Sequence, residues 1–179
     1  MSRLSRFSLG AAVAAGVTVL MAGALPAQQW RTLEARRALT PATRADTLHV
    51  HLAYAVGKLT FGAADEALLY DLRMSYDADE RRVKYHYDSA AHTLTVGDDS
   101  GFTNAFSFRH GHDGRDEDAR HPSLALGVAA GVPLDLALDF SAVDAALDMS
   151  RLELSRLSIE TSASDSRITF GTPNHGRIS

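Results

Sequence analysis

One segment of this 179-residue chain gathers side chains that bind metal ions or move protons. Residues 109–121 combine four carboxylates with three imidazoles, which belong to His110, His112 and His121. Imidazole nitrogens bind zinc or copper when they converge at about 2.0–2.1 Å in a roughly tetrahedral arrangement. Three arginines in the same segment oppose a dication and pair with the same carboxylates. Two interpretations therefore stay open, a metal-binding loop and a solvated charged loop.

Three further groups of polar residues occur in alternating segments. His49 and His51 share one face of an extended segment, and so do Asp135 and Asp139. Side chains two positions apart point to the same side of a strand, so these four residues are expected on a polar outer face. In the segment 83–88, alternation places Tyr85 and Tyr87 inward with Val83 and leaves His86 outside. None of these patterns requires a site.

The signatures of common enzyme classes are missing. The chain contains no cysteine nucleophile, no GxSxG motif, no phosphate-binding loop and no dinucleotide fingerprint. We therefore expect a non-enzymatic protein with no cofactor. A pair of glycosidase carboxylates about 5–9 Å apart leaves no local pattern in a sequence, so a carbohydrate-active enzyme stays open as a third hypothesis.

The elements that must position these residues are predicted to be strands. Apolar and polar residues alternate over 48–56 and 68–76, and shorter alternating segments follow at 83–87, 94–96 and 102–108. No part of the chain after residue 27 shows a clear helical stripe. The sequence therefore predicts an all-β fold.

A second pattern appears after residue 132. Leu136, Leu147, Leu157 and Ile168 lie at the centres of successive apolar pairs, which recur every ten or eleven positions. Such short and regular spacing is typical of stacked turns, each of which adds short strands to a common ladder, as in a β-solenoid. Strands at a similar spacing also occur in antiparallel meanders, so an antiparallel β-sandwich is the alternative.

The N-terminal segment has the features of a signal peptide. Arg3 and Arg6 precede an uncharged apolar stretch that ends in small residues, with cleavage expected after Ala24 or Ala27. An uncleaved membrane anchor is the alternative. Without cysteine there is no lipidation site and no disulfide framework. We expect a signal peptide at 1–27, an N-terminal extension at 28–45, a single β domain at 46–171 and a C-terminal tail at 172–179.

Charge and composition indicate which classes of partner the chain disfavours and whether it folds. Removal of residues 1–27 takes away two arginines and no acidic residue, so the formal charge falls from −4 to −6. This balance disfavours nucleic acid and anionic lipid as partners. A hydrophobic content of 45% with 22% charged residues is ordinary for a globular domain, which argues against a disordered chain.

The second half of the chain resembles a bacterial family. Its segments 132–140, 146–149 and 152–165 are similar to the proline-led alternating strand, the leucine-aspartate turn and the small-residue rung end of putative-adhesin or toastrack-type domains, which are related to the C-terminal domain of LiaF-like cell-wall stress proteins. The resemblance implies stacked β-strands on the outer side of a bacterial membrane and a role in envelope stress or adhesion. Ser141 and Ala142 replace the family's usual glycine pair.

These observations lead to one main functional hypothesis. We expect an exported, non-enzymatic envelope protein, in the periplasm or at the cell surface, that presents its β scaffold to an envelope component or, through its end strands, to another copy of itself. We expect no membrane span once the signal peptide is removed. The alternative is a periplasmic metal-binding protein that uses residues 109–121.

Overall fold

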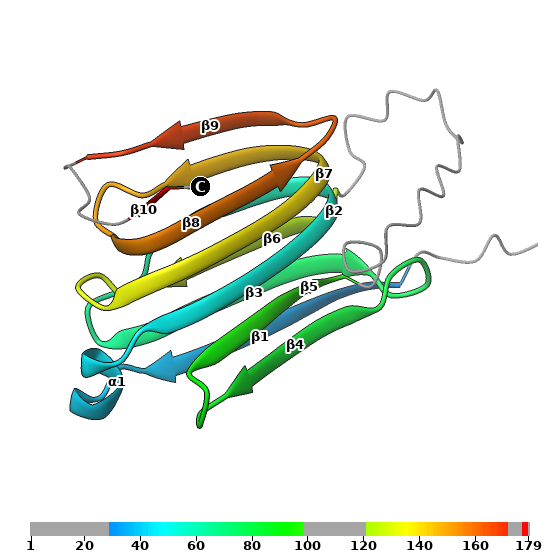
Figure 1. Ribbon diagram of the computed structural model, residues 1–179. Helices are drawn as coiled ribbons and strands as arrows, with labels where there is room; N and C mark the ends of the chain where they lie inside the picture. Colours follow the sequence, from blue (N-terminus) through cyan, green and yellow to red (C-terminus); the bar gives the residue numbers. More distant parts are fainter. Residues whose placement is uncertain (1–28, 99–120, 172–176, 179) are drawn as a thin grey trace, which may run out of the picture.

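The computed structural model describes residues 29–98, 121–171 and 177–178 (Figure 1). Ten strands and one short helix make up this part of the chain. The strands are β1 Trp30–Ala38, β2 Leu48–Ala63, β3 Leu68–Asp77, β4 Val83–Asp88, β5 Thr93–Asp98, β6 Ser123–Val128, β7 Pro133–Asp148, β8 Glu153–Thr161, β9 Asp165–Thr169 and β10 Arg177–Ile178; the helix is α1 Pro41–Ala45. The all-β prediction is confirmed.

Two long strands organise the sheet. β2 and β7 have 16 residues each and pair in parallel along nearly their whole length, from Leu48–Leu134 to Phe61–Leu147. The opposite edge of β2 pairs first with β5 and then with β6. The outer edge of β7 likewise pairs first with β8 and then with β9. Each long strand therefore belongs to two layers in turn.

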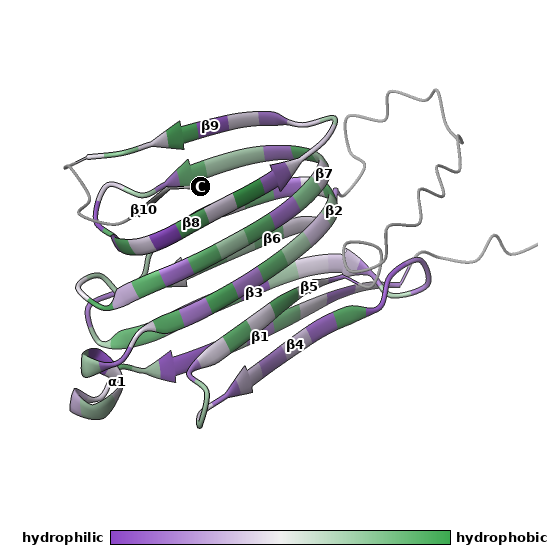
Figure 2. Cartoon of the chain, in the orientation of Figure 1, coloured by the Kyte–Doolittle hydropathy of each residue, from purple (hydrophilic) through white to green (hydrophobic). Residues whose placement is uncertain are grey.

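The result is one curled sheet with two layers around a core (Figure 1). The front layer contains β4, β5, the first halves of β2 and β7, β8 and β10. The back layer contains β1, β3, β6, the second halves of β2 and β7, and β9. Between them lies a continuous core of leucine, valine and aromatic side chains, and the alternation of hydropathy along each strand is visible in Figure 2.

The later strands form stacked rungs. β7 makes one rung, with a front half and a back half, and β8 and β9 make the next. Leu136 pairs in register with Leu157, and Leu147 pairs with Ile168, so each of these pairs joins equivalent positions of successive rungs. The sequence interval from Leu136 to Leu147 is therefore half a rung. The central pairs are parallel, so the β-solenoid-like stack is the observed architecture and the antiparallel sandwich is not.

The corner between the layers depends on a glycine in β2. Gly57 has a φ of +119°, and a Cβ atom there would lie 2.3 Å from the carbonyl oxygen of Pro122 and 2.8 Å from the hydroxyl of Tyr54. Only glycine adopts this conformation without strain and leaves this space. β7 turns the same corner at Ser141 and Ala142 in extended conformation, so the missing glycine pair does not interrupt that strand.

The residues expected as an N-terminal extension contribute to the sheet. β1 pairs antiparallel with β3 from Trp30–Asp77 to Ala38–Leu68. A register shift at the end of this pair leaves Leu69 as an extra residue in β3. Such a bulge re-aims side chains, and Leu69 is fully buried although simple alternation placed it on the polar face.

Helix α1 connects β1 to β2 and begins with a capping box. The backbone amide of Thr43 donates to the hydroxyl of Thr40, and the backbone amide of Thr40 donates to the hydroxyl of Thr43. These bonds satisfy donors that a short helix otherwise leaves free. Among the residues described here, no helix has the length and apolar character needed to cross a membrane.

Candidate interaction surfaces

The outer side of the front layer, here called the front face, presents ordered rows of polar side chains. One row contains residues that are in register across five strands, namely His86, Thr95, His51, Ala137 and Ser158. A second row contains Asp88, Thr93, His49, Asp135 and Arg156. Neighbouring strands lie about 4.8 Å apart, so each row is about 19 Å long. The front face therefore carries an ordered array in which every residue of the two rows except Ala137 is polar.

The histidines and aspartates that the sequence assigned to an outer face lie there. His49 and Asp135 are half-buried and His51 and Asp139 are exposed, while the leucines between them are buried. His49 Nδ1 lies 3.3 Å from Asp135 Oδ2 on the neighbouring strand. This contact joins β2 to β7 across the front face.

Two carboxylates are neighbours on the same face. Asp139 of β7 pairs in register with Glu160 of β8. The pKa of Asp139 is raised, first by partial burial and second by the negative charge of Glu160. Both residues are exposed on an open sheet.

A buried ion pair lies near the corner of the sheet. Arg81, in the turn between β3 and β4, donates from Nη1 to Asp98 Oδ2 at 2.9 Å, and the two side chains are 14% and 1% exposed. Tyr54 of β2 is close enough for both charges to act on its hydroxyl, whose pKa is raised mainly by burial. The sequence alone does not predict this pair, because neither residue carries a local signal for a partner 17 positions away.

Aromatic side chains fill the space between the two layers near β1 and β4. The hydroxyls of Tyr70 and Tyr85 share a hydrogen bond of 2.6 Å, and the rings of Tyr70 and Tyr87 lie 5.5 Å apart. The guanidinium of Arg37 lies 4.4 Å above the ring of Tyr87, which joins β1 of the back layer to β4 of the front layer. Tyr85 faces the inner side of the sheet as expected, in register with the buried Val96, and is 37% exposed because it lies at the rim.

The histidine-rich segment lies mostly outside the described residues. His110 and His112 belong to residues 99–120, and the strand predicted at 102–108 also lies there. His121 is described and is exposed just before Pro122 and β6. Within the described ranges, no three His, Cys, Asp or Glu side chains come together as a metal site would require. Metal binding by His110, His112 and His121 stays a prediction.

The stacked rungs and the antiparallel β1–β3 pair together correspond to one known domain. The family described as the N-terminal domain of toast_rack, DUF2154, matches residues 30–177. The chain belongs to this family. The match begins at the first residue of β1, so it includes the segment that the sequence suggested was an extension, and it reaches β10.

Solved structures are similar to this toast_rack domain at low sequence identity. A putative cell adhesion protein from Clostridium sporogenes is 17% identical, with a TM-score of 0.54, over 83% of this chain and 66% of its own. A putative adhesin from Bacteroides fragilis is 10% identical, with a TM-score of 0.38, over 80% and 54%. Another from Parabacteroides merdae is 8% identical, with a TM-score of 0.33, over 78% and 56%. No curated protein matches the chain in sequence.

The toast_rack chain thus spans just under two thirds of the first of these structures and little more than half of the other two. At the identity of the first structure, the likeness shows a common fold alone. The activities and partners of these longer proteins come to this chain only as proposals.

Proposed function

We propose that this toast_rack domain is an exported, non-enzymatic module of the cell envelope that presents its rigid β scaffold to another envelope component. The observation that carries the proposal is the front face, where two rows of polar side chains are held at strand spacing over five strands. A stacked sheet keeps such an array rigid, so binding a partner costs little ordering of the protein. The cell adhesion protein of similar fold supports the same role.

The described polar groups support a role without catalysis. The front-face carboxylates Asp139 and Glu160 are open to solvent, and the buried charges of Arg81 and Asp98 neutralise each other. Catalytic groups are usually held in a concave pocket with strongly perturbed pKa values and a place for the substrate. Scaffolding fits this arrangement better than acid-base chemistry does.

Export is tested with residues 1–40 fused to a reporter enzyme that is active only outside the cytoplasm. We expect activity in the envelope fraction and its loss when Arg3 and Arg6 are replaced by glutamate. Mass spectrometry of the full chain recovered from cells should show a new N-terminus after Ala24 or Ala27. A cytoplasmic, unprocessed chain would contradict this part of the proposal.

Scaffolding is tested by sedimentation of the purified chain with isolated cell-wall polymer and with membrane vesicles. We expect binding to one of the two, and its loss when His51→Glu and Ser158→Lys are combined on the front face. The matched control is Thr60→Lys on the exposed outer side of the back layer, which should bind normally. Equal binding by both variants, or no binding to either fraction, would refute the role assigned to the front face.

A narrower form of the proposal is a role in envelope stress. Cells that lack the chain should then become more sensitive to antibiotics that act on the cell wall, and the front-face double variant should fail to restore resistance. If that variant restores resistance, the stress role does not depend on the front face.

A further inference from the structure

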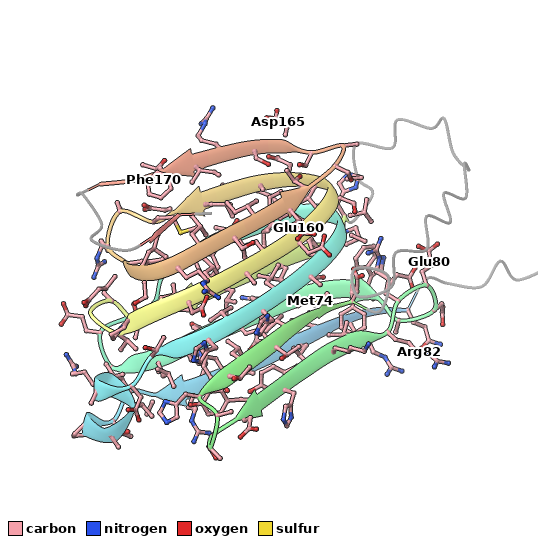
Figure 3. The ribbon with its side chains drawn as sticks, viewed as in Figure 1. Met74, Glu80, Arg82, Glu160, Asp165 and Phe170 are labelled. Carbon is pink, nitrogen blue, oxygen red and sulfur yellow. The ribbon has the colours of Figure 1, made fainter. Side chains whose placement is uncertain are left out.

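The rung made by β8 and β9 carries large apolar side chains, as a rung with a neighbour on each side would. Leu147 near the end of β7 and Met149 just after that strand are 2% and 1% exposed, and the same register places Ile168 and Phe170 beside them. Ile168 and Phe170 are 38% and 46% exposed, because no described strand covers them. Figure 3 shows Asp165 and Phe170 at opposite ends of β9, at the top of the molecule. Ile168 and Phe170 therefore lie in line with core residues of the β7 rung, and no further strand among the described residues covers them.

The backbone edge of β9 is also open. β9 pairs with β7 on one side, and no strand among the described residues pairs with its other side. A shallow depression of about 570 Å³ lies along it, lined by residues 144–146 and 165–168. Edge strands that stay unpaired are usually protected by charged residues, above all lysine, by proline or by a bulge. β9 contains no lysine and no proline, and its two exposed charges, Asp165 and Arg167, are of opposite sign.

At the opposite end of the stack, side chains connect the two layers. There, Arg37 and the tyrosines connect β1 to β4 across the two layers. β1 also carries exposed charges, and two of them form ion pairs with β3, Arg36 with Asp71 at 2.9 Å and Glu34 with Arg73 at 3.3 Å. β1 and β4 are also edge strands among the described residues, and exposed charges protect β1. The two most exposed large apolar side chains, Ile168 and Phe170, lie instead at β9, so this edge is the one considered for association of identical chains.

We propose that two copies of this chain associate through β9, with the two strands antiparallel and Ser166 on the two-fold axis. This goes beyond the scaffold function and does not depend on it. In this register Asp165 of each copy lies opposite Arg167 of the other, so the outer face gains two pairs of opposite charges. A register with Arg167 on the axis instead places like charges opposite each other. The apolar Ile168 and Phe170 become covered by the second copy.

Because the contact is symmetrical and uses the β9 edge of both copies, it produces a closed dimer and no filament. Sedimentation equilibrium of the purified chain should show a monomer-dimer equilibrium. The double variant Ile168→Lys/Phe170→Lys should remain monomeric at every concentration tested, with an unchanged circular dichroism spectrum. Arg31→Asp, a charge change on the exposed side of β1, is the control and should dimerise normally. A monomeric wild-type chain, or a dimer insensitive to the β9 changes, would overturn the proposal and leave the scaffold function standing.

Charge reversal tests the register. Asp165→Arg and Arg167→Asp should each weaken the dimer by about tenfold, because each places like charges opposite each other twice. The double variant Asp165→Arg/Arg167→Asp restores opposite charges at both places and should dimerise like the wild type. Failure of this rescue would rule out the proposed register.

A disulfide gives an independent measurement, since the chain has no cysteine of its own. Residues directly opposite in an antiparallel pair have Cα atoms about 4.5–5.5 Å apart, within reach of a disulfide. Ser166→Cys should therefore form a covalent dimer under mild oxidation. In the same register, two cysteines at position 168 are offset along the strands by about 13 Å, so Ile168→Cys should not crosslink. Crosslinking through position 168 in place of 166 would refute the proposed axis.

Discussion

Leu157 lies directly beside Leu136 in the parallel pair of β7 and β8, and both side chains are buried in the same core. Parallel neighbours in register point to the same side of the sheet, so each rung covers the apolar face of the rung before it. The stability of the stack therefore depends on these repeated leucine contacts.

Truncation of Leu136 tests this dependence. Leu136→Ala should lower the free energy of unfolding by about 2–5 kcal/mol, because it removes a fully buried side chain and leaves a cavity. Ala137→Ser, on the half-buried outer side of the same strand, should change it by less than about 1 kcal/mol. Denaturant unfolding of both variants measures the difference. Similar effects at the two positions would contradict the assigned faces of β7.

The corner of β2 should not tolerate a side chain at position 57. Gly57→Ala combines a positive φ with a clash against backbone atoms of Pro122, so we expect a loss of about 2–4 kcal/mol in unfolding free energy. Gly62→Ala is the matched control, because its Cβ would be 3.5 Å from the carbonyl oxygen of Asp148, an ordinary contact. Thermal unfolding compares the two, and equal melting temperatures would contradict the role of Gly57.

The stability of the fold should depend on Arg81 and Asp98 together, because each neutralises the charge of the other. Arg81→Met leaves the carboxylate of Asp98 buried without this ion pair, which typically costs about 3–5 kcal/mol. The double variant Arg81→Met/Asp98→Leu removes both charges and should recover much of that loss. Arg36→Ala, which breaks a pair whose side chains are 68% and 33% exposed, should cost less than about 1 kcal/mol. Urea unfolding curves measure the free energy of unfolding of each variant and test this order of losses.

Two aspartates should give opposite dependences of stability on pH. The pKa of Asp88 is lowered, mainly by backbone amides of Ala91 and Ala90 that donate to it. Its stabilising effect is therefore present above the unfolded pKa and disappears as the pH falls through the folded pKa. The pKa of Asp139 is raised, so its ionised form destabilises the fold, and this effect disappears as the pH falls below the unfolded pKa.

Melting temperatures of the asparagine variants check these signs. At pH 7 we expect Asp88→Asn to melt below the wild type and Asp139→Asn slightly above it. Near pH 3 both differences should shrink, since the native aspartates are then largely protonated. A difference of the same sign for the two variants at pH 7 would contradict one of the two assignments.

Metal binding by residues 109–121 is tested by calorimetric titration of the purified chain with zinc and with copper. The scaffold function predicts no heat of specific binding. A saturable heat that disappears when His110, His112 and His121 are replaced by alanine would favour the alternative hypothesis of a metal-binding protein.

Much of the secondary structure could be predicted from the alternation of residue types. Strands β2, β3, β4 and β5 lie where the pattern places them, because burial of one sheet face requires a period of two. Leu69 did not follow the pattern, and Tyr85, which faces inward as the pattern predicts, is more exposed than the other inward residues. Tyr85 lies on an edge strand at the rim, and Leu69 is in a bulge, and neither condition is visible in the spacing of neighbouring residues.

The sequence by itself determined the all-β class, the polar outer positions of His49, His51, Asp135 and Asp139, and the regular short interval between apolar pairs, because each follows from the local periodicity of a pleated strand. Only the tertiary structure decided that two such intervals make one rung, that Arg81 meets Asp98, and that β9 stays at an open edge. Those facts depend on which distant strands pair, and pairing is selected by the total burial of the folded chain rather than by any short segment.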